Sequence, residues 1–64
     1  SNGEYFALLS RARRIGSNYD LLSREERRRQ QEAFRSYLDE KYDPSDEAVT
    51  RLKIAVTTGD EFGY

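Results

Sequence analysis

The segment that begins at Ser23 constrains the fold of this chain more than any other feature. It opens with Ser-Arg-Glu-Glu, a capping box in which the Ser23 hydroxyl accepts a hydrogen bond from the Glu26 amide and the Glu26 side chain reaches back to the Ser23 amide. Good helix formers, mainly arginine, glutamate, glutamine, alanine and leucine, dominate from there to about Tyr42. We therefore predict a long helix over residues 24–42. Its short apolar face consists of Phe34, Tyr37 and Leu38.

A first helix is predicted ahead of this segment, over residues 4–15. Apolar side chains recur there at intervals of three and four residues, which places them on one face of a helix. Gly16 follows this stripe and suits a left-handed C-terminal cap, so the helix is expected to end there. The stripe consists of Tyr5, Leu8, Leu9, Ala12 and Ile15.

A third helix is predicted over residues 44–58. Asp43 can cap it, Pro44 suits its first position, and the acidic residues that follow complement the positive end of the helix dipole. Residues 51–57 also alternate between apolar side chains and charged or small ones, which fits a strand. The caps and the length of the segment favour a helix, and a strand over 51–57 is the alternative. The apolar stripe of this helix would consist of Ala48, Val49, Leu52, Ala55 and Val56.

Three helices joined by short turns predict an all-α fold, a compact three-helix bundle. The 64 residues make a single small helical domain, 1–64, which could have been excised from a longer protein because the chain has no initiator Met. Its core is thin, since hydrophobic residues are only 36% of the chain. With no Cys and no His, neither a disulfide nor the usual zinc site can reinforce it. Close helix packing, a second copy of the chain or a partner protein is expected to stabilise it instead.

Catalysis is not expected of this chain. Without His or Cys it lacks the commonest general base and the strongest side-chain nucleophile. Its acidic pairs, such as Asp39-Glu40, are adjacent in sequence and would point about 100° apart on a helix. The four glycines are scattered, so no glycine-rich phosphate loop is present. We therefore predict no catalytic residue, no cofactor, no metal site and no small-molecule substrate.

The arginines are the main candidates for binding. On the central helix Arg24, Arg28 and Arg35 share one stripe, and Arg13 stands on the first helix. This stripe could follow a phosphate backbone, meet an anionic protein, or be neutralised locally by i,i+4 pairs. The expected local pairs are Glu25 with Arg29, Arg28 with Glu32, and Arg35 with Asp39. Glutamates at the start of the helix argue against its insertion into a DNA groove, because they would approach phosphates.

Two apolar residues lie off the predicted stripes. Phe6 is beside Arg13 on the first helix, and Ile54 points away from the stripe of the third, so both are expected to be exposed and to mark an interface. The halves of the chain also differ in charge, because residues 1–35 are net basic and residues 36–64 net acidic. Such asymmetry can pair two copies head to tail or offer a basic face to an acidic partner.

These features predict a protein-protein interaction or adaptor module that self-associates or docks a partner protein. The alternative is a small nucleic-acid-binding regulatory protein that uses the arginine stripe of the central helix. No apolar run approaches the roughly 18 residues of a spanning helix, so we expect no membrane association. The absence of Cys permits a cytoplasmic location, which is the default expectation. The predicted partner-binding residues are Phe6, Arg13, Arg24, Arg28, Arg35 and Ile54.

Overall fold

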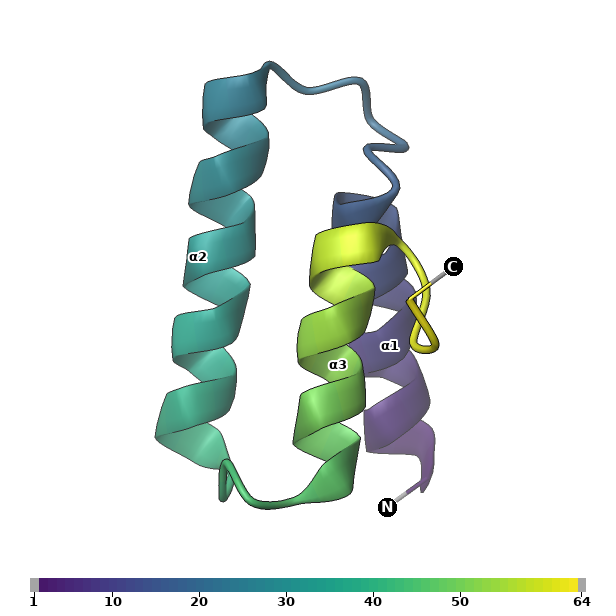
Figure 1. Ribbon diagram of the computed structural model, residues 1–64, viewed down its shortest axis with the longest axis vertical. Coiled ribbons are helices and arrows are strands. Elements are labelled where there is room, and N and C mark those ends of the chain that lie inside the picture. Colours follow the sequence, from purple (N-terminus) through teal and green to yellow (C-terminus); the bar gives the residue numbers. More distant parts are fainter. Residues whose placement is uncertain (1, 64) are drawn as a thin grey trace.

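The computed structural model describes residues 2–63, which form three α-helices and no strand. The helices are α1 (Asn2–Gly16), α2 (Arg24–Lys41) and α3 (Glu47–Thr58). The all-α three-helix bundle is therefore confirmed, and the segment 51–57 is helical rather than a strand. The chain runs along α1, returns along α2 and runs again along α3, so that α1 and α3 point the same way (Figure 1).

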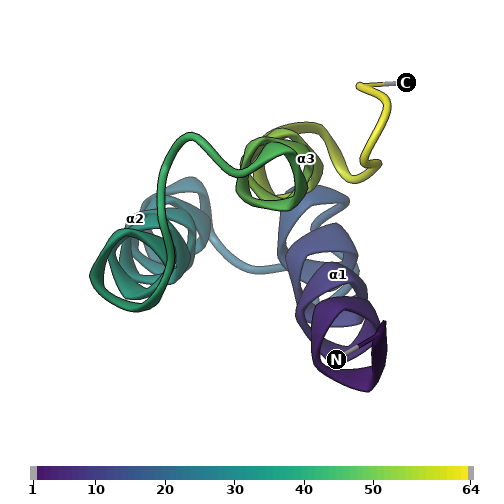
Figure 2. The same ribbon diagram turned by 90° about the horizontal axis from the view of Figure 1, so that it is seen from below.

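The helices α1 and α3 form a close pair, and α2 stands further from both (Figure 2). Gly16 explains how close the pair comes. A Cβ atom at this position would overlap the carbonyl oxygen of Ala55 and would lie 2.5 Å from the backbone nitrogen of Gly59. The left-handed cap predicted at Gly16 is wrong, because Gly16 is the last residue of α1 and the left-handed backbone occurs at Asn18, with φ 55°. Glycine is required at position 16 because any side chain there would collide with the backbone of α3 and its cap.

The core is small and comes mainly from α1 and α3. The helix α2 contributes only Phe34 and Leu38, and the guanidinium of Arg11 covers the Phe34 ring at 5.6 Å from its centroid. Polar contacts therefore also hold α2 against the other two helices. One of them is the hydrogen bond of 2.9 Å from Gln31 Nε2 to the Val56 carbonyl. The buried core residues are Leu9, Ala12, Ile15, Phe34, Leu38, Val49, Leu52, Ala55 and Val56.

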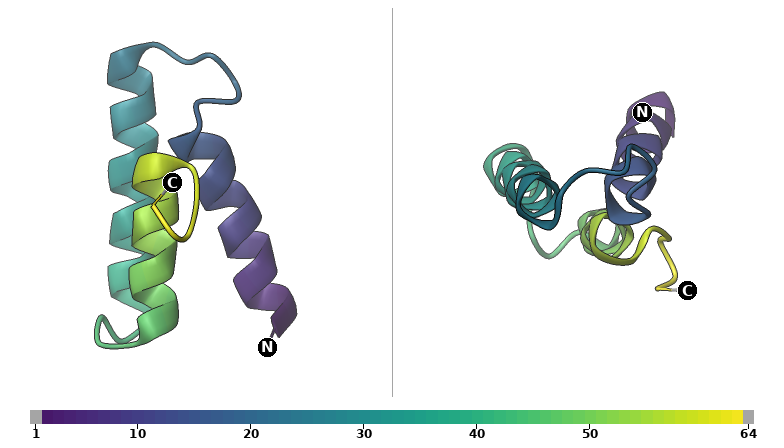
Figure 3. Two further views of the ribbon diagram at one scale, coloured as in Figure 1. Left: turned by 45° about the vertical axis from the view of Figure 1, so that its right-hand side comes forward. Right: turned by 90° about the horizontal axis from the view of Figure 1, so that it is seen from above.

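The start of α2 follows the predicted cap in part. The Ser23 hydroxyl accepts a hydrogen bond from the Glu26 amide at 3.1 Å, as expected of an N-cap. The Glu26 side chain instead takes Arg29, at 2.6 Å, and this pair lowers the pKa of Glu26 chiefly through the Arg29 hydrogen bond. The first turn of α2 extends past the ends of α1 and α3 (Figures 1 and 3), and Arg24 in that turn is exposed.

The start of α3 corrects the predicted cap. Its N-cap is Asp46, which accepts from the Ala48 amide at 2.9 Å, so the helix begins at Glu47 rather than at Pro44. Asp43 is occupied elsewhere, since its carboxylate accepts from the backbone and the hydroxyl of Ser45 at 2.9 and 2.8 Å. These bonds lower the pKa of Asp43 and form a local turn before the helix.

Candidate functional site

The arginines of α2 divide into structural and free groups. Arg35 is structural, because its guanidinium donates to the Thr57 hydroxyl of α3 at 2.6 Å. Arg27 donates to the carbonyl oxygens of Ile15, at 3.2 Å, and of Gly16. It also reaches the Thr57 carbonyl at 3.4 Å. Arg27 thus neutralises the negative C-terminal ends of both α1 and α3, where a cation is favoured.

Arg24 and Arg28 form the free group. Both are exposed, and within residues 2–63 their guanidinium groups make no ion pair or side-chain hydrogen bond. Of the predicted local pairs, Glu25 with Arg29 is confirmed at 3.0 Å. The other two are wrong. For Arg35 and Asp39 the reason is that α3 supplies competing partners, because Thr57 binds Arg35 and Lys53 binds Asp39 at 2.7 Å. Arg28 and Glu32 do not form the expected ion pair either, and no competing contact in the described part of the chain explains its absence.

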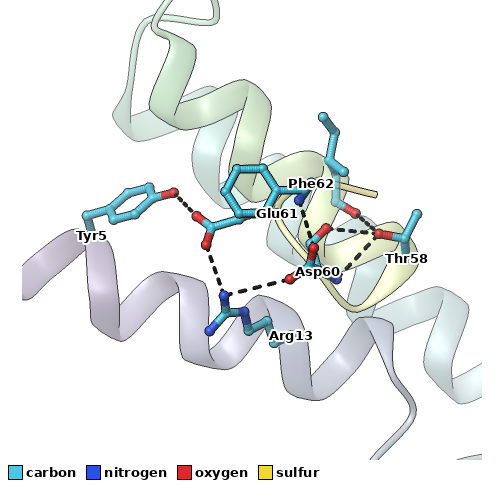
Figure 4. A network of polar contacts seen from close by, with 7 residues as sticks. Tyr5, Arg13, Thr58, Asp60, Glu61 and Phe62 are labelled. Atoms are coloured by element: carbon cyan, nitrogen blue, oxygen red, sulfur yellow. Dashed lines mark hydrogen bonds and ion pairs between the residues drawn. The ribbon is translucent and has the colours of Figure 1, made fainter. Parts of the chain in front are cut away.

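Arg13 is engaged by the C-terminal turn. Its guanidinium lies 2.9 Å from the carboxylate of Glu61 and 3.8 Å from that of Asp60 (Figure 4). The Tyr5 hydroxyl donates to the other Glu61 oxygen at 2.9 Å, and burial together with this bond raises the pKa of Tyr5. Arg13 therefore holds the turn of Asp60 and Glu61 against α1.

The two predicted apolar markers are exposed, as expected, but on different surfaces. Phe6 is 63% exposed, and its ring meets the Tyr5 ring edge to face, with centroids 5.7 Å apart. Ile54 is 36% exposed and shares an open hollow of about 400 Å³ with Arg35. Phe6 does not line that hollow. The six predicted residues are therefore not brought together into one site.

Among residues 2–63, the most exposed large apolar residue is one that sequence reasoning missed. Leu21, in the connection between α1 and α2, is 88% exposed, and Tyr19 beside it is 73% exposed. Leu21 also has a left-handed backbone, with φ 53°. That conformation costs a residue with a Cβ atom roughly 1–2 kcal/mol, so this loop holds a bulky side chain outward at an energetic cost.

Side-chain contacts fix the loop in this conformation. Arg14 donates to both carboxylate oxygens of Asp20, at 2.8 and 2.6 Å, and lies 5.0 Å above the Tyr19 ring. The Arg14 hydrogen bonds lower the pKa of Asp20. On the other side, the Asn18 side chain accepts from the Leu22 amide at 2.9 Å and donates to its carbonyl at 3.2 Å. The Leu21 amide completes the turn by donating to the Asn18 carbonyl at 3.0 Å.

The loop and the first two turns of α2 together form what we call the loop-end site. Its residues are Tyr19 and Leu21, which are exposed and apolar, and Arg24 and Arg28, which are exposed and uncompensated. The two leucines before Ser23 are a sequence signal from which the exposed Leu21 of this site could have been predicted. Only the residue directly before an N-cap packs as a hydrophobic staple. Leu22 holds that position and is half-buried, which leaves Leu21 to project.

Other kinds of site find no support in the part of the chain that the structure describes. Across residues 2–63, acidic side chains never gather in a group of three or more that could hold a metal ion. No helix within that range is both long and apolar enough to cross a membrane. Comparison with protein-family models, with curated proteins and with solved structures gave no match. The fold class, an all-α three-helix bundle, is what the structure defines.

Proposed function

We propose that this chain is a non-enzymatic protein-interaction module that docks a partner protein through the loop-end site. The observation that carries the proposal is the state of Leu21, which is almost fully exposed in a left-handed backbone. An aliphatic side chain in water contributes little to the stability of the free chain, and its backbone conformation costs stability. Strain of this kind, held in place by surrounding contacts, is typical of recognition sites.

The rigidity of the loop supports the same proposal. Because Arg14 and Asn18 fix the turn from both sides, Leu21 needs little further ordering when it binds. A preorganised anchor loses less entropy on association than a mobile one. Tyr19 adds a flat apolar surface beside it, a residue type enriched among the energetic centres of interfaces.

The charges around the anchor indicate the kind of partner. Arg24 and Arg28 have no carboxylate partner among the described residues, and they follow Leu21 on the first turns of α2. A partner with an apolar pocket and an acidic rim would fit both features. The rim charges would mainly increase the rate of association and make it depend on salt.

Nucleic-acid binding is the second candidate, and the same two arginines favour it. The supply of cations is small, however, because Arg35 and Arg27 are engaged within the fold. Glu25 and Glu26 also stand at the end of α2 that would approach the phosphates. Binding of this kind would weaken steeply with salt and would not use the Leu21 side chain.

Site-specific crosslinking tests the proposal. A photoreactive residue is incorporated into the full chain at position 21, or, as the control, at the exposed position of Ser36 in α2. Each labelled protein is then irradiated in its native extract. We expect one crosslinked protein from position 21 and none from position 36, with the contacted peptide identified by mass spectrometry. The purified pair should then lose at least tenfold in affinity on Leu21→Ser.

Two outcomes would overturn the proposal. One is equal crosslinking from positions 21 and 36, and the other is a purified pair whose affinity Leu21→Ser leaves unchanged. A short DNA or RNA duplex at low salt tests the second candidate. Salt-sensitive binding that survives Leu21→Ser and is lost in the double variant Arg24→Ala, Arg28→Ala would replace the proposed function with nucleic-acid binding.

A further inference from the structure

We infer that the partner of the loop-end site is a second copy of this chain, with Leu21 of one copy seated in an apolar hollow at the opposite end of the next. This inference rests on the proposed function and names the partner. Its parts are the exposed side chain described above, a matching hollow, and opposite charges at the two ends of the molecule.

The hollow lies between the N-terminal halves of α1 and α3 and holds about 100 Å³. That space is several times the ~30 Å³ of a water molecule and below the ~150 Å³ of a cavity that binds benzene. It therefore suits one aliphatic side chain. Its walls come from Leu8, Ala48, Val49, Leu52 and the rings of Tyr5 and Tyr42, and its acidic residues are Glu4 and Asp46.

The hollow and Leu21 cannot meet within one chain. Leu21 belongs to the connection between α1 and α2, and the hollow includes Tyr42 and Asp46 from the connection between α2 and α3. These connections lie at opposite ends of the bundle (Figure 1), whose longest extent is 31 Å. A contact between them must therefore join two molecules.

The charges of the two ends are complementary. Residues 39–47, at the end with the hollow, carry five acidic side chains and only one lysine. One of these acids, Asp46, lines the hollow itself, and Glu4 of α1 lines it too. The opposite end carries the uncompensated Arg24 and Arg28, which follow Leu21 in the chain. Seating Leu21 in the hollow thus brings unpaired cations toward an acidic rim.

The symmetry of this contact is head to tail. Each copy inserts Leu21 at one end and accepts the Leu21 of another copy in the hollow at its other end. A pair of copies therefore still has one unoccupied hollow and one uninserted Leu21. Association of this type continues into a ring or an open chain rather than stopping at a dimer. The contact is small, and we expect it to be weak and to grow with concentration.

The test measures weight-average mass against concentration by sedimentation equilibrium at low salt. Wild type should rise above the monomer mass of 7.5 kDa as concentration increases. Leu21→Ser removes the inserted side chain, and Ala48→Leu fills the hollow, so each variant alone should remain monomeric. The double variant Arg24→Glu, Arg28→Glu, on an exposed surface, should also lower the association at least tenfold. Phe62→Ser, which removes an exposed apolar group from the C-terminal turn outside both ends, is the matched control and should associate as wild type does.

Mixing the two single variants gives the sharpest result. Leu21→Ser keeps an open hollow and Ala48→Leu keeps the inserting leucine, so a mixture should form a dimer of twice the monomer mass and stop there. Wild type that stays monomeric across the range would overturn this inference, as would variants that each self-associate as wild type does. In either case crosslinking of position 21 to a different protein would leave the proposed function standing, whereas an absence of any crosslink would remove both.

Discussion

Arg14 donates two hydrogen bonds to Asp20, one from Nε at 2.8 Å and one from Nη2 at 2.6 Å. The two residues are six positions apart and lie on either side of the end of α1. Their contact ties the loop back to the helix that precedes it, and Leu21 follows directly. The conformation of the most exposed leucine in the molecule thus depends on an ion pair that pH can break.

Acid should therefore loosen the loop before it unfolds the bundle. The Arg14 hydrogen bonds set the pKa of Asp20 below its unfolded value of about 3.9. A depressed pKa means that the contribution of Asp20 is present above that value and is lost as pH falls through the folded pKa. We expect the Leu21 amide, which donates to Asn18, to lose protection from hydrogen exchange below about pH 4. Asp20→Asn should show the same loss at neutral pH, and unchanged protection in this variant would contradict the account.

Two adjacent arginines on α2 should differ in their effect on stability. Arg27→Ala removes the donor to the C-terminal carbonyls of α1 and α3, and we expect a loss of about 1–2 kcal/mol in the free energy of unfolding. Arg28→Ala removes an exposed side chain without an internal partner and should change stability by less than about 0.5 kcal/mol. Urea denaturation of the two variants provides the comparison. Equal losses would show that the division into structural and free arginines is wrong.

Alanine at Gly16 should destabilise the protein, although glycine to alanine inside a helix usually stabilises it. The added Cβ would overlap the Ala55 carbonyl and approach the backbone of Gly59, neither of which can turn away as a side chain could. We expect a loss of about 1–3 kcal/mol from overpacking, read as a lower thermal midpoint in circular dichroism. Ser10→Ala, on the outer face of the same helix, is the control and should match or slightly exceed wild type.

The Tyr42 hydroxyl should ionise only at unusually high pH. Its hydroxyl donates to the Glu4 carboxylate beside the apolar hollow, and this bond is the main cause that raises its pKa to about 12. Because the folded pKa lies above the unfolded value, the contribution to stability is present below about pH 10 and is lost as pH rises toward 12. NMR titration should show that the assigned ring carbons of Tyr42 titrate late, and Glu4→Gln should shift this transition to lower pH. A Tyr42 transition that stays late in Glu4→Gln would assign the shift to another cause.

The fold could be predicted from the sequence because its signals are local. The Ser23 cap and the stripes of α1 and α3 depend on residues three or four positions apart, and the structure confirms them. The start of α3 was misplaced because Asp43 and Asp46 are both good caps. Only the bonds from Ser45 to Asp43 decide between them.

The candidate site could be predicted only in part, because its determinants are tertiary. The residues that flank Arg35 in the sequence do not distinguish it from Arg28. In the structure Arg35 donates to Thr57, whereas Arg28 is exposed to solvent. Leu21 was missed for a similar reason. Its exposure follows from the left-handed turn that Asn18 and Arg14 impose, and a composition or periodicity argument assigns a leucine to the core by default.

The central claim, that Leu21 is held outward for a contact outside the free chain, is tested most directly by the free energy of unfolding of Leu21→Gly. Glycine removes a steric cost of roughly 1–2 kcal/mol in the left-handed backbone and adds about 0.5–1 kcal/mol of chain entropy. At protein concentrations low enough to keep the chain monomeric, the account predicts that Leu21→Gly is more stable than wild type by about 0.5–1 kcal/mol. A loss of about 1 kcal/mol or more, the size of a buried methylene group, would show that Leu21 stabilises the free chain itself and would contradict the claim.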